Sequence, residues 1–275
     1  MIKPIEQLTI VDDFMCGAVM SNPQLCKTLL EVVLGVKIRE IVYPELQKVI
    51  DKRYDSKSIR LDVYVADEAG TVYNVEIQTT DKKNLPQRSR YYQGMIDLNV
   101  LEKGADYREL KRSFVIFICT YDPFGEGRYV YTFENLCREN PRIALGDQAT
   151  KIFLNTKGYV GKVSAALKEL LRYMDTFQPT GDYTRKLEQE VEAVRRDEKW
   201  GREYMRIHEF EREKIRLGEY KGRVELVRQS RNRFNVDELA DIYYIDLKTV
   251  RAILNAIDTH PDWDDEQIAE NIDFD

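Results

Sequence analysis

Two alternating runs joined by a short turn constrain the fold of this chain most strongly. Residues 59–65 and residues 72–79 each place apolar side chains at every second position, which is typical of β-strands. The turn between them, Asp67-Glu68-Ala69-Gly70-Thr71, starts with Asp and carries Gly three residues later. This is the pattern of a type I turn whose last residue is left-handed, so the sequence predicts a three-residue hairpin loop.

The hairpin loop also fixes which residues face each other. Its register opposes Asp62 to Glu76 and Arg60 to Gln78. Two carboxylates opposed on one sheet face would lie about 5 Å apart at Cβ and would repel each other. A divalent cation such as Mg²⁺ relieves that repulsion, because hard cations prefer oxygen ligands. The alternative is a solvated hairpin face with ordinary polar residues.

Composition limits the classes of protein that remain. The chain has 275 residues and is 43% hydrophobic, enough for one large domain or for one domain with a small companion. It has no run of 18 apolar residues and no apolar signal-peptide stretch near its first residue, so we expect a cytoplasmic protein. Only two histidines are present, which argues against a His-based triad or a His-rich metal site. The four cysteines lack zinc spacing and are expected to be reduced and structural.

Charge is distributed unevenly along the chain. The net charge is −6, but residues 258–275 hold eight acids and no Lys or Arg, which leaves +2 for residues 1–257. Basic residues gather at 82–90 and at 221–233. Each basic stretch is either a solvated helix face or a nucleic-acid contact. The acidic tail is either a solvated end without a partner, or a mimic of a DNA backbone that occupies one of these basic surfaces.

The remaining pattern predicts a mixed α/β sheet. Thr9-x-x-Asp12 and Asn22-Pro23 mark the starts of two helices, the second of which ends at Gly35. A strand near residues 43–50, the hairpin, a helix from residue 84 to about residue 103 and a buried strand at residues 114–119 follow. Two further strands are expected at residues 129–133 and 150–154, and a helix at residues 163–174.

The C-terminal part has a different character. Residues 181–235 are dense in Glu, Lys and Arg and predict a charged helical arm, which offers a surface for a homo-oligomer. Residues 236–275 predict a small helical hairpin that ends in the acidic tail. Ala240, Val250 and Ile253 have the spacing of a helix-turn-helix, although Tyr244 stands where that motif usually has glycine. An ordinary α-hairpin explains the same pattern. The first domain would then span residues 1–180.

The chain resembles a known family in several separate strings. These are Asp62 with Glu76-Ile77-Gln78, the segment Arg88-Ser89-Arg90-Tyr91-Tyr92, and the strand at residues 114–118. Asp12-Asp13-Phe14-Met15, Tyr121-Asp122-Pro123-Phe124-Gly125 and the segment at residues 151–158 agree with them. Over residues 8–175 the chain is similar to the PD-(D/E)XK nucleases, and more narrowly to the recombination-promoting nuclease (Rpn) or "putative transposase" family of bacteria.

This resemblance implies a restriction-endonuclease-like αβββαβ core and a Mg²⁺- or Mn²⁺-dependent DNA endonuclease of the recombination-promoting, transposase-like kind. Asp62 and Glu76 match the metal ligands of the family, and the Ile77 carbonyl and Glu31 are further candidates. Gln78 stands where the wider superfamily has Lys, and it would orient water without contributing charge. Metal-activated water would hydrolyse a DNA phosphodiester.

Two further expectations follow from the resemblance. Arg88 and Arg90 would contact backbone phosphates, or else form salt bridges on the helix surface. An alternative function is a nuclease fold that has lost catalysis and acts as a DNA-binding or partner-binding module.

Overall fold

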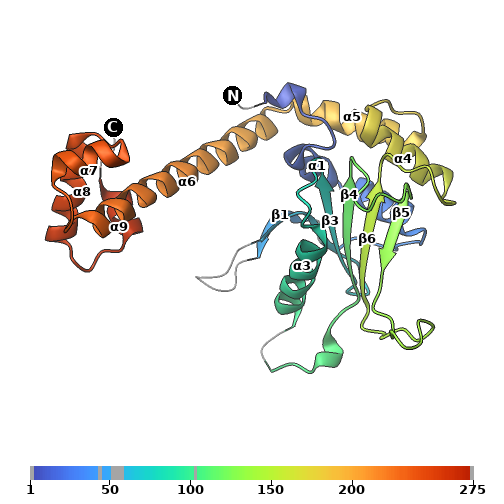
Figure 1. Cartoon of the computed structure of the whole chain (residues 1–275). Helices are drawn as coiled ribbons and strands as arrows, with labels where there is room; N and C mark the ends of the chain where they lie inside the picture. Colours follow the sequence, from blue (N-terminus) through green and yellow to red (C-terminus); the bar gives the residue numbers. More distant parts are fainter. Residues whose placement is uncertain (1–2, 43–44, 51–58, 102–103, 273–275) are drawn as a thin grey trace. The chain divides into compact units, whose positions relative to one another are not determined.

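A computed structural model describes residues 3–42, 45–50, 59–101 and 104–272, with the backbone alone for residues 45–50, 59–62 and 211. The chain divides into two compact units, residues 1–201 and residues 202–275. The first contains the sheet and the helices that cover it (Figure 1).

Six strands form one mixed sheet, as the sequence predicts. Its order is β1-β2-β3-β4-β6-β5. Strands β3, β4 and β6 run parallel, and the other neighbours are antiparallel. The strands are β1 (Glu45–Ile50), β2 (Ile59–Ala66), β3 (Val72–Gln78), β4 (Ser113–Cys119), β5 (Val130–Phe133) and β6 (Ala149–Asn155).

Helices make up most of the remaining structure. The first unit contains α1 (Asp13–Met20), α2 (Pro23–Leu34), α3 (Leu85–Val100), α4 (Ala165–Thr176) and α5 (Asp182–Arg196), with short 3-10 turns η1 (Ile5–Gln7) and η2 (Tyr107–Glu109). Helix α6 (Glu198–Ser230) leads into α7 (Val236–Tyr243), α8 (Leu247–Thr259) and α9 (Asp265–Asn271). The order of the elements is that of an αβββαβ core followed by a helical region.

The β2–β3 hairpin has the register that its loop predicts. The Asp67 amide donates to the Thr71 carbonyl at 3.0 Å, and Gly70 adopts the left-handed conformation with φ of 80°. Val63 pairs with Val75, and Tyr64 pairs with Asn74. Continuing this register by one residue sets the backbone of Asp62 opposite Glu76.

The predicted helix signals of α2 are confirmed. The Asn22 side chain accepts from the amides of Gln24 and Leu25, and Pro23 occupies the first helical position. Gly35 ends the helix with φ of 67°, a conformation that most side chains avoid. These local signals need no tertiary contact, which is why they can be read from the sequence.

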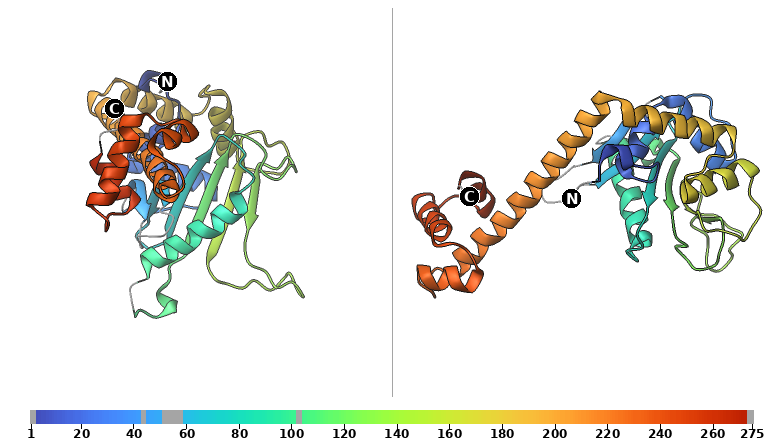
Figure 2. Two further views of the ribbon diagram at one scale, coloured as in Figure 1. Left: turned by 60° about the vertical axis from the view of Figure 1, so that its left-hand side comes forward. Right: turned by 90° about the horizontal axis from the view of Figure 1, so that it is seen from above.

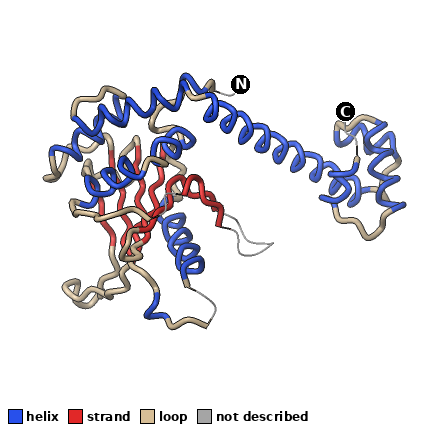
Figure 3. The backbone as a smooth tube through the Cα atoms, turned by 180° about the vertical axis from the view of Figure 1, so that it is seen from behind, coloured by secondary structure: helices blue, strands red, loops and turns tan. Residues whose placement is uncertain are grey.

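The two faces of the sheet are covered differently. Helix α3 lies across one face, where Tyr92 stacks on Phe117 of β4 (Figures 1 and 2). Helices α1, α2, α4 and α5 contact one another and cover the other face (Figure 3). Strand β4 is buried along almost its whole length, as its continuous apolar sequence predicts.

The first unit extends further than predicted. The sequence placed the boundary after residue 180 and assigned the next segment to a charged arm. Helix α5 instead contacts α1, α2 and α4, and it buries Leu187, Val191 and Val194. The helix is amphipathic, with its apolar side chains on one face and most of its charged residues on the others, so a count of charges could not separate it from a solvated arm.

The second unit has its own apolar core. Ala240, Val250 and Ile253 are buried in it, at the positions that the helix-turn-helix pattern predicts. Tyr244 takes the left-handed conformation at the turn, with φ of 55°, and its side chain is 94% exposed. A non-glycine residue thus takes the left-handed conformation at this turn, and its ring points into solvent without displacing a neighbour.

The acidic tail is folded over most of its length. Helix α9 buries Ile268 and Ala269 in the core of the second unit. The tail's carboxylates pair with cations of α6 and of the turn that follows it, namely Arg228 with Asp265 at 2.6 Å, Lys221 with Glu266 at 2.8 Å, and Arg231 with Asp258 at 2.8 Å. A solvated end without a partner does not describe these residues.

Helix α9 should therefore stabilise the second unit. We predict that Ile268→Ala lowers the free energy of unfolding of this unit by about 2–5 kcal/mol, because it leaves a cavity in a small core. Urea unfolding followed by circular dichroism measures the effect, with Glu270→Gln on the exposed side of α9 as the control. Equal stability of the two variants would show that the tail contributes no core.

Candidate active site

The site lies where the parallel strands β3, β4 and β6 end. Glu76 and Gln78 of β3 are paired with Phe117 and Cys119 of β4. Because paired residues point to the same side of a sheet, both polar side chains belong to the face that α3 covers. The carboxyl ends of parallel strands are a common place for a binding crevice.

Glu76 is a fully buried carboxylate with an exposed fraction of 0%. Its Oε2 atom accepts a hydrogen bond from Arg88 Nη2 at 2.9 Å. The Asn74 side chain, also buried, donates to Oε1 at 3.4 Å. A buried charge is stable only when it is paired, and Arg88 supplies such a partner for Glu76.

Arg88 connects the helix to the strand. Its Nη1 atom donates to Gln78 Oε1 at 2.7 Å, and its Nε atom donates to Tyr92 Oη at 2.7 Å. The guanidinium also lies 5.0 Å from the centre of the Tyr92 ring. Planar Arg suits this role because its rigid fork can serve three acceptors at once. The residue therefore fixes the geometry of the site in addition to supplying charge.

Gln78 is held at both ends of its amide. Its Oε1 atom accepts from Arg88, and its Nε2 atom donates to the Ile77 carbonyl at 2.7 Å. The amide keeps one further N–H and one further lone pair. It therefore retains one donor and one acceptor position for an additional contact such as a water molecule.

Asp62 is only partly described. Its backbone lies in β2, and the register sets it opposite Glu76. Its side chain lies outside the described residues, as does that of Arg60. The carboxylate pair that the hairpin predicts therefore stays a prediction. Among the side chains that the structure does describe, no cluster of three or more His, Cys, Asp and Glu residues has the arrangement of a metal site.

Glu31 does not lie with these residues. Its carboxylate accepts from the Ile38 amide at 2.9 Å and pairs with Lys37 at 3.3 Å. The pKa of Glu31 lies below its usual value, because these two contacts outweigh a burial that alone would raise it. Helix α2 covers the sheet face opposite α3, so the structure gives Glu31 a role at the end of its own helix.

Arg90 is exposed on α3, two residues beyond Arg88. The two arginines thus differ. Arg88 pairs with the buried carboxylate of strand β3, which is not the salt bridge on the helix surface that the sequence offered as the alternative. A contact between Arg88 and a phosphate stays a prediction. Arg90 faces solvent and is accessible to a ligand.

Three further polar residues lie at this end of the sheet without having been singled out as site residues. Tyr121 follows β4 and packs against the same apolar cluster as Tyr92. Asn155 ends β6 and is paired with Cys119. Asp81 follows β3 and pairs with Lys83 at 2.5 Å. The topology brings these three residues to the same end of the sheet from positions far apart in the sequence. In the sequence, only their positions after predicted strands could have indicated that they lie near the site.

Cys119 is not a nucleophile in this arrangement. Burial raises the pKa of its thiol to about 12, so the thiol stays protonated at neutral pH. All four cysteines are free thiols, as the sequence predicts.

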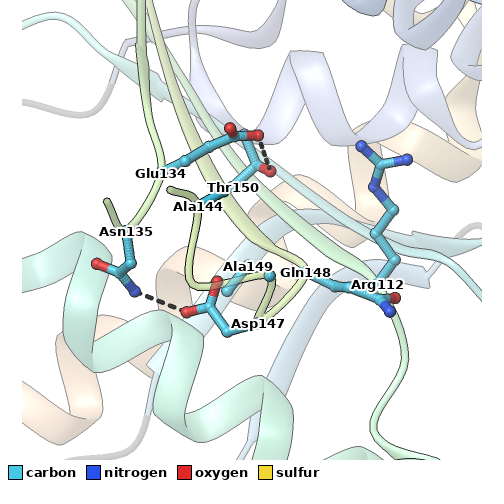
Figure 4. Close-up of a pocket in the computed structure, with 9 residues that line it drawn as sticks. Arg112, Glu134, Asn135, Ala144, Asp147, Gln148, Ala149 and Thr150 are labelled. Atoms are coloured by element: carbon cyan, nitrogen blue, oxygen red, sulfur yellow. Dashed lines mark hydrogen bonds between the residues drawn. The ribbon is translucent and has the colours of Figure 1, made fainter. Parts of the chain in front are cut away.

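A pocket of about 410 Å³ lies at the opposite end of the strands, where β4 and β6 begin (Figure 4). Its lining comes from the residue before β4, from the segment that joins β5 to β6 and from the start of β6: Arg112, Glu134, Asn135, Ala144, Gly146, Asp147, Gln148, Ala149 and Thr150. Hydrogen bonds link Asn135 to Asp147 and Thr150 to Glu134 across it. Because it lies at the amino ends of the parallel strands, the pocket is separate from Glu76 and Gln78.

Comparison with known proteins identifies the family. Residues 15–216 match the family described as PD-(D/E)XK nuclease family transposase. This stretch covers more than half of the chain, so the protein belongs to that family. No curated protein and no solved structure matched the chain. Among the described helices, none is long and apolar enough to cross a membrane.

The buried ion pair gives a prediction about stability. Arg88→Ala should destabilise the first unit by about 3–5 kcal/mol, because it leaves the Glu76 carboxylate buried without its cation. Arg90→Ala, two residues away on the exposed side of α3, should change stability by less than about 0.5 kcal/mol. Chemical denaturation of the two variants measures the difference. Equal stabilities would show that Arg88 does not support Glu76.

Proposed function

We propose that this member of the PD-(D/E)XK nuclease family is a metal-dependent DNA endonuclease. The observation that carries the proposal is the buried Glu76 carboxylate beside Gln78, held by Arg88 at the carboxyl end of a parallel strand. DNA as substrate, Mg²⁺ or Mn²⁺ as cofactor, a part in DNA recombination and a cytoplasmic location belong to the same proposal.

The residues present fit a hard cation. Glu76 offers a carboxylate and Ile77 a backbone carbonyl, both at the end of β3, and the register brings the backbone of Asp62 opposite Glu76. Oxygen donors of this kind suit Mg²⁺ and Mn²⁺. A cation bound there would lower the pKa of a water molecule and stabilise negative charge on a phosphate.

The protein's own side chains prepare that chemistry. Arg88 donates to one carboxylate oxygen of Glu76, and the Asn74 side chain donates to the other. Gln78 is fixed between Arg88 and the Ile77 carbonyl, so its remaining N–H and lone pair point in set directions. We propose that these groups orient the attacking water, a positioning role that needs no charge.

Exposed cations next to the site favour a nucleic-acid substrate. Lys82, Lys83 and Arg90 are exposed on the segment that joins β3 to α3 and on α3 itself. Phosphate contacts of this type give affinity that falls as salt concentration rises. Their position beside Glu76 would align a DNA strand with the carboxylate.

Glu76→Gln tests the proposal most simply. The change keeps the size of the side chain but removes the negative charge that a cation requires. We expect Mg²⁺-dependent nicking of supercoiled plasmid DNA by the unaltered protein, and a loss of at least about 100-fold in the variant. Circular dichroism and thermal unfolding check that the variant is folded.

Two results would count against the nuclease proposal. Cleavage at the normal rate by Glu76→Gln would place the chemistry elsewhere. Tight DNA binding without cleavage in Mg²⁺ or Mn²⁺ would favour the alternative, a nuclease fold that binds DNA or a partner without catalysis.

Gln78→Ala tests the role of the amide. If Gln78 orients water, the variant should cleave about 10- to 100-fold more slowly, while the concentration of Mg²⁺ that gives half-maximal activity changes little. Single-turnover cleavage over a Mg²⁺ series measures both quantities. A large rise in the Mg²⁺ requirement with an unchanged maximal rate would assign Gln78 to metal binding.

A further inference from the structure

The exposed side of α8 takes no part in the proposed function. Helix α8 follows α7 after the three-residue turn 244–246, within the second unit (Figure 1). One side of the helix is buried, at Thr249, Val250, Ile253, Ala256 and Ile257. The other side is accessible and carries Leu247, Lys248, Arg251 and Asn255, all of which are exposed. A ligand can therefore reach these side chains without any movement of the fold.

The turn between α7 and α8 has the length and conformation of a helix-turn-helix. Tyr244 is left-handed, with φ of 55° and ψ of 41°, and the next residue, Ile245, is buried. The Ile245 amide donates to the Ala240 carbonyl at 3.1 Å, which closes the end of α7. In this motif the second helix enters the major groove of DNA, and the exposed residues of its first turns meet the bases.

The exposed side chains of α8 have the chemistry that reads base edges. Lys248, Arg251 and Asn255 are spaced by three and four residues, so they lie along one side of the helix. Arg and Lys donate to the O6 and N7 atoms of guanine, and Asn pairs with the N6 and N7 atoms of adenine. A row of these residue types offers recognition of a base sequence in the major groove.

The acids at the two ends of α8 are engaged by protein groups. Asp246, the residue before the helix, accepts from the Thr249 amide at 2.8 Å and caps the helix. Asp258, in its last turn, pairs with Arg231 at 2.8 Å. Between these two acids, Lys248 and Arg251 are the only charged residues of the sequence. The exposed side of α8 is therefore locally positive, which suits the negative potential of a DNA groove.

The charge of the whole second unit decides what kind of DNA binding it supports. Residues 202–275 contain more acids than bases, and Asp237 and Asp241 are exposed on α7. Affinity for DNA of any sequence comes mainly from cations that neutralise phosphates. A unit with this charge gains little from phosphates, so its binding has to depend on contacts with base edges. The charge therefore favours selective binding over general binding.

We propose that the second unit is a helix-turn-helix that reads a DNA sequence with α8. Arg251 donates to the major-groove edge of a guanine, Asn255 pairs with that of an adenine, and Lys248 adds a contact at the start of the helix. This is a second DNA site, in a different unit from Glu76 and Gln78. The inference does not rest on the nuclease proposal, because binding without cleavage tests it.

Selection from a pool of DNA duplexes with a randomised centre tests the assignment, with the full-length protein in EDTA so that no DNA is cleaved. The unaltered protein should enrich a common motif, and Arg251→Ala and Asn255→Ala should each lose the preference at one position of it. In fluorescence anisotropy, each change should raise the Kd for a labelled duplex carrying the motif about tenfold or more. The Kd for a duplex with the motif scrambled should change far less, because that duplex offers no matched base.

Arg212→Ala is the matched control. It removes an exposed arginine of the same unit, but from α6 instead of α8. The control should enrich the same motif as the unaltered protein and keep the ratio of the two Kd values. All three altered side chains are exposed, so circular dichroism and the Tm should show that each variant is folded like the unaltered protein.

Two results would overturn the assignment. In the first, the unaltered protein enriches no motif, which would leave the exposed side of α8 to a protein partner. In the second, Arg251→Ala and Asn255→Ala enrich the same motif as Arg212→Ala, which would place sequence reading elsewhere in the chain. A motif that depends on α8, without cleavage in Mg²⁺, would support the helix-turn-helix and contradict the nuclease proposal alone. Cleavage in Mg²⁺ without any enriched motif would do the reverse.

Discussion

The buried ion pair between Glu76 and Arg88 is the interaction on which the site depends. Taking a carboxylate out of water costs several kcal/mol unless a partner compensates for it. Arg88 reaches the end of β3 from α3, a helix that also packs apolar side chains on this face of the sheet. It also determines the surroundings, since the same guanidinium holds Gln78 and Tyr92. The arrangement places a buried carboxylate, an amide and an aromatic hydroxyl around one guanidinium.

Much of the fold could be predicted from local signals. The alternation of apolar and polar residues predicted the two strands of the hairpin, and Asp67 with Gly70 predicted its loop and register. Asn22 and Gly35 gave the ends of α2. These features depend on neighbours within a few residues, so the sequence contains all the information they need. The family match over residues 15–216 agrees with the fold that the motifs suggested.

The site was harder to predict because it is assembled from distant elements. Arg88 looked like a phosphate contact or a surface salt bridge, and its contact with Glu76 depends on how α3 crosses the sheet. Glu31 is acidic and helical, yet its helix covers the other face and its carboxylate serves Ile38. Helix α9 looked like a solvated acidic end because charge counts do not show that Ile268 is buried. In each case tertiary packing decided the outcome, which local patterns cannot specify.

The most direct test of the account is a crystal structure of the protein soaked in Mn²⁺, examined for anomalous scattering. We predict a peak about 2.1–2.2 Å from a Glu76 carboxylate oxygen, with the Ile77 carbonyl and Asp62 in the same coordination shell. Arg88 should keep its hydrogen bond to Gln78 when the ion is bound. A Mn²⁺ ion bound elsewhere, with Glu76 still engaged only by protein groups at saturating metal, would contradict the claim that this carboxylate is a metal ligand.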